Sequence, residues 1–255
     1  MFSLRARYAS PGRTVVTAHR GFSGQYPENT LLAFSKAYEL GVDVLEFDVR
    51  ESADGGLVVI HDATLDRTTT GTGRVDQHPL SALKRLNASC WEGPHDRGRR
   101  LSDPSGEAEI PALEEVLSAF AGKVGLNIQV YTDRKEALDT IVRLYLHHDL
   151  RASGFLMLRT FAEAERVRAL SPDVALCVGE DRVNLARHLS FGVDYVQPTR
   201  QCLTEPFVLR LQETGIPANV FYANDRDIMA ELMARKIPGI MTDIPDVLLD
   251  LIHSI

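Results

Sequence analysis

Short apolar runs alternate along the chain with longer amphipathic segments. An apolar run bounded by turn residues indicates a buried strand. Eight such runs are present, and we expect strands over residues 14–19, 43–49, 124–131, 154–159, 173–178, 193–197, 217–222 and 238–242. The pattern therefore predicts a sheet of eight strands spread over the whole chain.

Segments with helical periodicity follow most of these strands. We expect helices over residues 30–40, 134–148, 161–171, 204–214 and 225–235. Gly41 and Gly215 follow two of them and suit the left-handed conformation that ends a helix. Alternation of strands and helices favours parallel strands with helical crossovers. Eight units in 255 residues match an α/β fold of the closed (β/α)8 type, a TIM barrel, and a doubly wound open sheet is the alternative.

One region interrupts the alternation. Residues 51–110 contain "VVIHDATLDRTTTGTG" and the Pro-, Gly- and Arg-rich "WEGPHDRGRRLSDPSGEAEIP". Connections longer than about 15 residues within a compact domain are usually functional or disordered. We therefore expect one TIM-barrel domain over residues 1–255, with 51–110 as an insertion after the second strand, over the mouth of the barrel.

Charge and composition narrow the range of partners. The net charge of −7 argues against a nucleic acid, which requires a basic surface, but is compatible with a small anionic substrate held by a local arginine. Three scattered cysteines form no zinc spacing, and no run reaches membrane-spanning length. The N-terminal residues lack the apolar core of a signal peptide. We expect a cytoplasmic protein with reduced thiols and no membrane span; the oligomeric state is left open.

Polar residues gather where the predicted strands end, which is where barrel enzymes carry their active sites. The candidates are His19, Arg20, Glu46, Asp48, His61, Asp62, Asn127, Gln129 and Tyr131.

Glu46 and Asp48 are two residues apart on one strand, so both side chains point to the same face. Two inward carboxylates repel each other, and a hard divalent cation such as Mg²⁺ or Ca²⁺ would neutralise them. The alternative is an edge strand whose carboxylates face solvent, since Phe47 and its apolar neighbours have the opposite phase.

His19 and His61 each follow an apolar run and precede a charged residue, Arg20 and Asp62. Histidine titrates near neutral pH, so one imidazole can accept a proton while the other donates one. The alternative is a pair of hydrogen-bonded structural histidines. Arg20 matches the geometry of a phosphate, or alternatively forms an ion pair with Glu46 or Asp48.

Two further groups have local as well as functional interpretations. Asn29 or Thr30 can cap the helix that follows, and Glu28 either reaches the site or stabilises that helix N-terminus. Asn127 and Gln129 share a face with Tyr131 and either line the pocket or contact a neighbouring helix.

The motifs "AHRG…PENT", "LEFDV" and "VVIHDATLDRTTTGTG" resemble those of the glycerophosphodiester phosphodiesterases. The likeness continues in "IPALEEVL" and in "NVFYANDRDIMAELMARKIPGIMTDIPDVL", and so covers nearly the whole chain. The resemblance implies a (β/α)8 barrel.

The resemblance also implies an activity: metal-assisted cleavage of a small-molecule glycerophosphodiester to sn-glycerol 3-phosphate and an alcohol. Glu46 and Asp48 would bind the divalent ion, Mg²⁺ or Ca²⁺, and Arg20 would hold the phosphoryl oxygens.

By the same resemblance His19 and His61 would be the general acid and base, and Asp62 would orient His61. The nucleophile would be water or the 2-hydroxyl of the substrate, which would give a cyclic phosphate. From their positions in the sequence, and not from the resemblance, we expect Asn127 and Glu28 to support the site.

The chain departs from the family pattern on the third strand, where Gln129 and Tyr131 stand in place of Glu-x-Lys. We expect Gln129 at the metal, as an uncharged oxygen ligand, and Tyr131 on the substrate side. One negative and one positive charge are lost together, which leaves the formal charge of the site unchanged. An active phosphodiesterase is the expected function. The alternatives are a non-catalytic or altered-specificity phosphodiester-binding barrel and a lyase-like relative that forms a cyclic phosphate.

Overall fold

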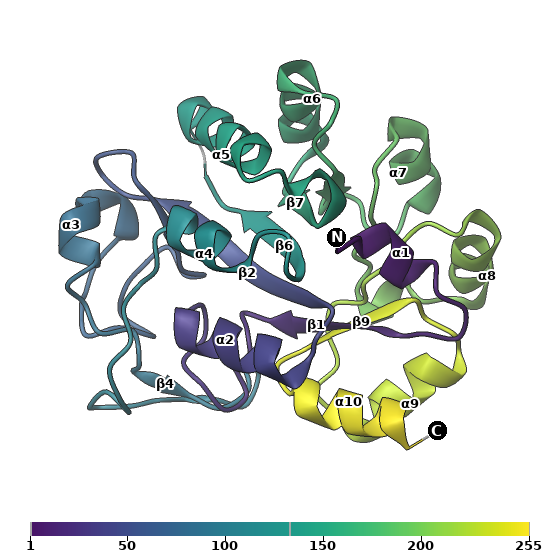
Figure 1. Cartoon of the computed structure of the whole chain (residues 1–255), viewed down its shortest axis with the longest axis horizontal. Coiled ribbons are helices and arrows are strands. Elements are labelled where there is room, and N and C mark those ends of the chain that lie inside the picture. Colours follow the sequence, from purple (N-terminus) through teal and green to yellow (C-terminus); the bar gives the residue numbers. More distant parts are fainter. Residues whose placement is uncertain (1, 133, 255) are drawn as a thin grey trace.

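The structure, a computed structural model, describes residues 2–132 and 134–254. Its main sheet curls around a central axis with helices on the outside (Figure 1). Six parallel strands run in the order β8-β7-β6-β2-β1-β9. They are β1 (Val15–His19), β2 (Val44–Glu51), β6 (Gly125–Val130), β7 (Gly154–Leu158), β8 (Leu176–Val178) and β9 (Gly239–Thr242).

The two remaining predicted strands, 193–197 and 217–222, are reduced to isolated backbone bridges. Val196 bridges Ala218, and Val220 bridges Ile240 of β9. On the other side, the backbone N–H of Tyr195 donates to the carbonyl oxygen of Leu176 in β8 at 3.0 Å. These bonds connect β8 to β9, so the chain forms the predicted (β/α)8 barrel. The prediction of regular strands at these two positions was wrong. Pro198 and Pro217 lack the N–H that a continuous ladder requires there.

The helices confirm the predicted periodicity. Those expected from the sequence are α2 (Leu31–Leu40), α5 (Lys135–His147), α6 (Phe161–Leu170), α8 (Glu205–Thr214) and α9 (Arg226–Ala234). Gly41 and Gly215 follow α2 and α8 with φ of 85° and 62°, as expected of helix-ending glycines. Four further helices are α1 (Leu4–Tyr8), α4 (Leu113–Phe120), α7 (Leu185–Phe191) and α10 (Pro245–His253), and short 3₁₀ turns are η2 (Leu150–Ala152) and η3 (Arg200–Cys202).

The barrel interior is apolar at one end and polar at the other. At the N-terminal end of the strands, Leu4 of α1 packs with Val15, Val44, Phe155 and other inward side chains in one buried cluster. The helix α1 thus closes this end of the barrel. Polar inward side chains are left to occupy the C-terminal end.

The faces of β2 decide where the acidic pair points. Phe47 packs against Phe34 of α2 with ring centroids 5.6 Å apart, and both are fully buried. Phe47 therefore faces the helices, and because successive side chains alternate, Glu46 and Asp48 face the barrel interior.

Residues 51–110 build a small unit with its own core. It comprises β3 (Leu57–Val59), η1 (Val75–Gln77), α3 (Leu80–Leu83), β4 (Trp91–Glu92) and β5 (Arg99–Arg100). The strand β3 pairs antiparallel with β2, and the buried residues Val58, Ile60, Leu65, Val75, Leu83, Ala88 and Ile110 form a separate cluster. The β4–β5 turn reaches the end of β9, where the His95 N–H donates to Asp243 Oδ2 at 2.8 Å.

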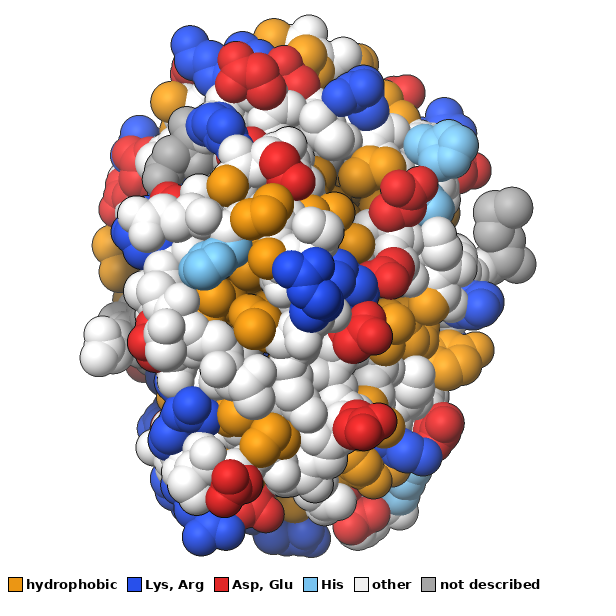
Figure 2. All heavy atoms as spheres, turned by 90° about the vertical axis from the view of Figure 1, so that its left-hand side faces the viewer, with side chains coloured by type: hydrophobic (Ala, Val, Ile, Leu, Met, Phe, Trp, Pro, Cys, Tyr) orange, Lys and Arg blue, Asp and Glu red, His pale blue; other side chains and the backbone are white. Residues whose placement is uncertain are grey.

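Figure 2 shows the side of the molecule that carries this unit, where acidic and basic side chains are interspersed with scattered hydrophobic ones. Among the helices of the described ranges, 2–132 and 134–254, none combines the length and the apolar character that a membrane span needs.

Candidate active site

His19 ends β1, and its imidazole is held by a carboxylate that follows the neighbouring strand β9. Its Nδ1 lies 2.6 Å from Oδ1 of Asp243, directly after β9, and its ring is only 2% exposed. Burial acts to raise the pKa of Asp243, but His19 and the hydrogen bond from Asn224 outweigh it and lower that pKa. The charged carboxylate favours a proton on Nδ1, which leaves Nε2, 4.0 Å from Glu46 Oε2, as the ring nitrogen that faces the acidic pair.

His61 follows β3 and is held in the same way by its neighbour. Its Nδ1 lies 2.7 Å from Asp62 Oδ1, and Asp62 in turn accepts two hydrogen bonds from Arg67 at 2.8 and 2.9 Å. Burial opposes the ionisation of Asp62, but these bonds lower its pKa below the ordinary value. The structure thus gives both predicted histidines a carboxylate partner and leaves Nε2 of each for chemistry.

A third histidine, His95 of the β4–β5 turn, lies between them. Its ring centroid is 5.6 Å from that of His19 and 5.9 Å from that of His61. Burial, together with Arg20 and His19, lowers the pKa of His95 to about 4. At neutral pH this imidazole is therefore uncharged. The sequence carried no signal for it beyond its place in a turn bounded by Pro94 and Gly98.

Glu46 and Asp48 lie side by side in the interior, each only 1% exposed. Glu46 Oε2 accepts the backbone N–H of Arg20 at 2.9 Å, and Asp48 Oδ2 accepts from Asn29 Nδ2 at 2.8 Å. Burial and the proximity of Asp48 raise the pKa of Glu46 well above its ordinary value. The pair therefore carries more negative charge than the surrounding protein compensates.

An ion pair of Arg20 with the acidic pair, the alternative open from the sequence, is confirmed for Asp48, and its binding of a phosphate stays a prediction. Arg20 Nη1 donates to Glu28 Oε1 at 2.8 Å, and its Nε lies 3.3 Å from Asp48 Oδ2. Its backbone has φ of 57°, the left-handed conformation that lets its N–H bond Glu46. Arg67 also contacts Glu28, with donor distances of 2.7 and 2.8 Å. Glu28 is thus shared by two arginines.

Replacing Glu28 by glutamine is expected to destabilise the protein by about 3 kcal/mol, because two arginines lose their shared buried anion. Burial opposes ionisation of Glu28, but Arg20 and Arg67 outweigh it and lower its pKa to about 2. A depressed carboxyl pKa stabilises the fold above the unfolded value of 4.5, and that stability is lost as the pH falls toward 2.

Urea denaturation at pH 7 and pH 3 measures both effects. Glu28→Gln should lose stability at pH 7 and show a shallower further loss at pH 3 than the wild type. Glu39→Gln, which removes an exposed carboxylate of α2, is the matched control. Equal stabilities of wild type and Glu28→Gln at pH 7 would contradict the assigned role.

The polar residues of β6, the third strand expected from the sequence, lie beside the acidic pair Glu46 and Asp48. In the register of β2 and β6, Asn127 stands beside Glu46 and Gln129 beside Asp48. Gln129 Nε2 donates to the hydroxyl of Tyr131, which leaves its amide oxygen as an acceptor. Asn127 Nδ2 donates to Gln197 Oε1 at 2.9 Å across the barrel. This bond holds the Asn127 side chain inside the barrel, beside Glu46.

Tyr131 stands between His61 of the insertion and Arg50 of β2. Its ring centroid lies 5.6 Å from that of His61, and the guanidinium of Arg50 sits 4.8 Å from the ring. Burial, with Asp48 and Glu46, raises the pKa of Tyr131 to about 12. At neutral pH the side chain is therefore an uncharged phenol.

The donor set is compatible with one hard cation. No group of three or more His, Cys, Asp or Glu side chains suited to a metal ion occurs in the described part of the chain. Two adjacent buried carboxylates with uncompensated charge and one amide are nevertheless oxygen ligands of the kind Mg²⁺ and Ca²⁺ take.

Several residues that contact the predicted site residues, directly or through Asp243, were not expected from the sequence to do so, namely Asn29, Arg67, His95, Asn224 and Asp243. Asp243 had a usable signal, since it directly follows the last strand in "GIMTD". Asn29 was considered only as a cap, but Thr30 is the residue that caps α2. Asn29 instead bonds Asp48, and its φ of 58° allows it to do so.

The polar residues gather at the C-terminal ends of the barrel strands, where enzymes of this fold carry their active sites. A sequence model described as the glycerophosphoryl diester phosphodiesterase family matches residues 19–247. The chain belongs to this family.

Named relatives and solved structures are similar over nearly the whole chain. The chain is 31% identical to a glycerophosphodiester phosphodiesterase of Caldanaerobacter subterraneus, over 95% of this chain and 99% of that protein. It is 28% identical to one of Bacillus subtilis, over 93% and 86%. The crystal structure of a glycerophosphodiester phosphodiesterase from Agrobacterium tumefaciens superposes with a TM-score of 0.77 at 26% identity, covering 92% of this chain and 99% of that one.

An Oleispira antarctica phosphodiesterase, solved in complex with the product sn-glycerol-3-phosphate, has a TM-score of 0.75 at 23% identity. It covers 93% of this chain and 96% of its own, and it shares the fold.

Proposed function

We propose that this protein is a metal-dependent enzyme that hydrolyses glycerophosphodiesters to sn-glycerol 3-phosphate and an alcohol. The observation that carries the proposal is the buried Glu46–Asp48 pair lying beside His19, with His61 across the mouth and each histidine anchored by its own aspartate. Family membership and the names of the relatives support the substrate class. The product complex of the Oleispira relative supports it further.

The two histidines supply the proton transfers. One Nε2 accepts the proton of the nucleophile as the new P–O bond forms, and the other donates a proton to the alkoxide as the old P–O bond breaks. The anchoring carboxylates, Asp243 and Asp62, stabilise whichever imidazole becomes charged. The nucleophile is water, or the 2-hydroxyl of the substrate followed by hydrolysis of the cyclic phosphate.

Glu46, Asp48 and Gln129 would hold the cation, Mg²⁺ or Ca²⁺. When bound, such an ion stabilises the negative charge that grows on the phosphoryl oxygens. Gln129 contributes no charge, so we expect weaker cation binding than a third carboxylate would give.

Arg20 positions the acidic pair and adds positive charge beside the phosphoryl group. Burial acts against its charge, but Glu28, Asp48 and Glu46 outweigh it and raise the pKa of Arg20. The guanidinium therefore stays charged throughout the reaction, and we assign it the binding of phosphoryl oxygens. Tyr131 is assigned to the substrate side of the site.

Analysis of the products tests the reaction type. Incubation of glycerophosphocholine and glycerophosphoethanolamine with the protein and Mg²⁺ or Ca²⁺, followed by phosphorus NMR, should show sn-glycerol 3-phosphate as the final product. A cyclic phosphate that accumulates would favour the lyase-like alternative. Saturable binding without any product would favour the non-catalytic barrel.

Restoring a carboxylate at position 129 is expected to strengthen cation binding. Gln129→Glu places a charge beside Asp48 in the β2–β6 register, so its dissociation constant for Ca²⁺ should fall by about tenfold or more. Gln129→Glu combined with Tyr131→Lys restores both charges and should turn over glycerophosphodiesters faster than either single variant.

Calorimetric titration and initial rates measure these two effects. Gln212→Glu, which adds a carboxylate on the exposed face of α8 away from the acidic pair, is the control for added charge. An unchanged titration in Gln129→Glu would mean that residue 129 is not at the ion. A double variant no faster than the single ones would rule out a coupled replacement.

A further inference from the structure

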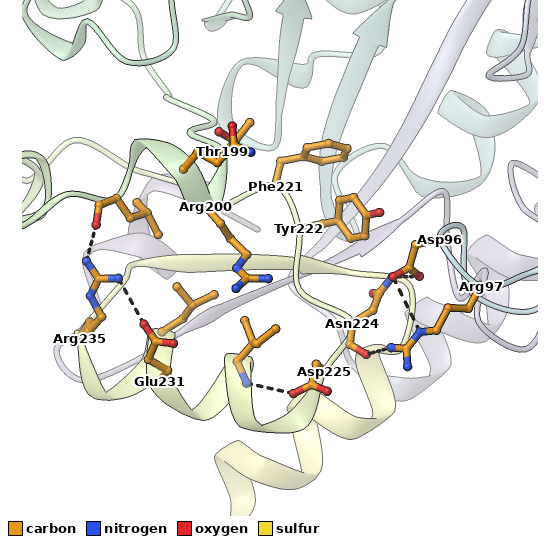
Figure 3. Close-up of a pocket in the computed structure, with 14 residues that line it drawn as sticks. Asp96, Arg97, Thr199, Arg200, Phe221, Tyr222, Asn224, Asp225, Glu231 and Arg235 are labelled. Carbon is orange, nitrogen blue, oxygen red and sulfur yellow. Dashed lines mark hydrogen bonds and ion pairs between the residues drawn. The ribbon is translucent and has the colours of Figure 1, made fainter.

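A cavity adjoins the candidate active site on the His19 side. It has a volume of about 670 Å³, within the roughly 300–1,000 Å³ typical of small-molecule pockets. Its walls come from the β4–β5 turn, from the η3 segment and from α9 with the loop before it (Figure 3).

Two wall residues connect this cavity to the catalytic groups. Tyr222 lines it and stacks on His19, with ring centroids 5.6 Å apart and planes inclined by 16°. Asn224 lines it and donates to Oδ2 of Asp243, the carboxylate that holds His19. Tyr222 and Asn224 thus place the wall of this cavity directly beside His19 and its carboxylate.

The carboxylates of the cavity already have partners. Asp96 accepts from Asn224 Nδ2 at 3.0 Å and lies 3.8 Å from Arg97, and Glu231 lies 3.5 Å from Arg235. Asp225 caps α9 by accepting the backbone N–H groups of the helix's first turn. These acidic groups are thus occupied by donors of the protein itself.

Arg200 is different. It begins η3 and its side chain points into the cavity, where no dashed line joins it to a neighbour (Figure 3). Across residues 2–132 and 134–254 no hydrogen bond or ion pair of its guanidinium is found. The lining carries three acidic and three basic side chains and so has no formal net charge. Of its three arginines, Arg97 and Arg235 bond protein acceptors, so the forked donors of Arg200 are the ones left to match a carboxylate or a phosphate.

We propose that this cavity binds the alcohol side of the substrate and that Arg200 selects alcohols that carry an anionic group. The inference rests on the proposed glycerophosphodiesterase function and specifies its substrate class. A cationic alcohol such as choline would meet carboxylates already bonded within the protein and an unpaired guanidinium. An alcohol that ends in a phosphate monoester or a carboxylate would supply the partner that Arg200 lacks.

Matched substrates test the selection. Diesters of sn-glycerol 3-phosphate with glycerol, with glycerol bearing a terminal phosphate, with glycolate and with choline differ in the charge of the alcohol. We expect the wild type to have a kcat/KM at least tenfold higher for the phosphate-bearing alcohol than for glycerol, and the lowest value for choline. The phosphate and glycolate arms show which anion Arg200 takes.

Arg200→Gln should reduce the ratio of kcat/KM for anionic over neutral alcohols by about tenfold, because a charge-assisted hydrogen bond is lost. Arg226→Gln removes another exposed arginine, outside the cavity wall, and should leave the ratio unchanged. Equal ratios in wild type and Arg200→Gln, or an equal fall in Arg226→Gln, would overturn the proposal.

Binding separates this proposal from the proposed function. Calorimetric titration with the same diesters needs no turnover. If no diester is hydrolysed but Arg200→Gln still weakens binding of the anionic ones, the hydrolytic function fails and the subsite stands. If the diesters are hydrolysed and Arg200→Gln changes neither rates nor affinities selectively, the subsite fails alone.

Discussion

Replacing His19 or His61 by alanine is expected to lower kcat by about 10²–10⁴-fold in each case, because each variant loses one of the two proton transfers. Both imidazoles have Nδ1 fixed by a carboxylate at 2.6 or 2.7 Å, so Nε2 is pre-oriented and no other side chain replaces it. His95 does not substitute for either. Its lowered pKa, about 4, makes it a poor acceptor of protons at neutral pH.

The control for these variants is His253→Ala, an exposed histidine at the end of α10, which should keep the wild-type kcat. His61→Ala should also retain the cation affinity of the wild type, because His61 is not among the proposed ligands. Rates near those of the wild type in either His19→Ala or His61→Ala would remove the acid–base mechanism.

Replacing Glu46 by glutamine or Asp48 by asparagine is expected to abolish measurable cation binding and to lower kcat by at least about 100-fold, since a hard cation is held chiefly by charged oxygen ligands. In the absence of the cation, Glu46→Gln should not destabilise the protein. Burial and Asp48 raise the pKa of Glu46, so its charge costs folding free energy at neutral pH, and Glu46→Gln removes that charge. The new amide oxygen can still accept the Arg20 N–H.

Thermal melting with and without about 5 mM Ca²⁺ or Mg²⁺ separates the two effects, because a cation that binds only the folded state stabilises it. The wild type should melt at a higher temperature with the cation, and Glu46→Gln should show no such increase while melting at or above the cation-free wild type. Glu39→Gln on the surface of α2 should behave like the wild type. A cation-dependent increase that persists in Glu46→Gln would place the ion elsewhere.

Much of the barrel followed from periodicity, and the exceptions have local causes. The strands whose segments contain no proline, such as β2 and β6, form the long ladder of the sheet. The runs that contain or precede a proline, 217–222 and 193–197, keep their place in the barrel but not a regular ladder. Periodicity reports burial, and a residue can be buried at a strand position without the backbone donor that a strand needs.

The site was predictable where residues are close in sequence and not where the chain returns from a distance. Glu46 and Asp48 share a face because they are two residues apart, and Asp62 holds His61 because it is adjacent. Asp243 is 224 residues from His19, and the two meet because β1 and β9 are neighbours at the barrel seam. His95 reaches the site through the fold of the insertion, which has no periodic pattern from which its path could be inferred.

The most direct test of the central claim is the initial rate of glycerophosphodiester hydrolysis after treatment with a chelator and after return of Mg²⁺ or Ca²⁺. The account predicts that the chelated protein is inactive, that one of the two ions restores activity, and that Asp48→Asn stays inactive at every ion concentration. Full activity in the chelated protein, or restoration in Asp48→Asn equal to that in the wild type, would contradict a cation held by the acidic pair of β2.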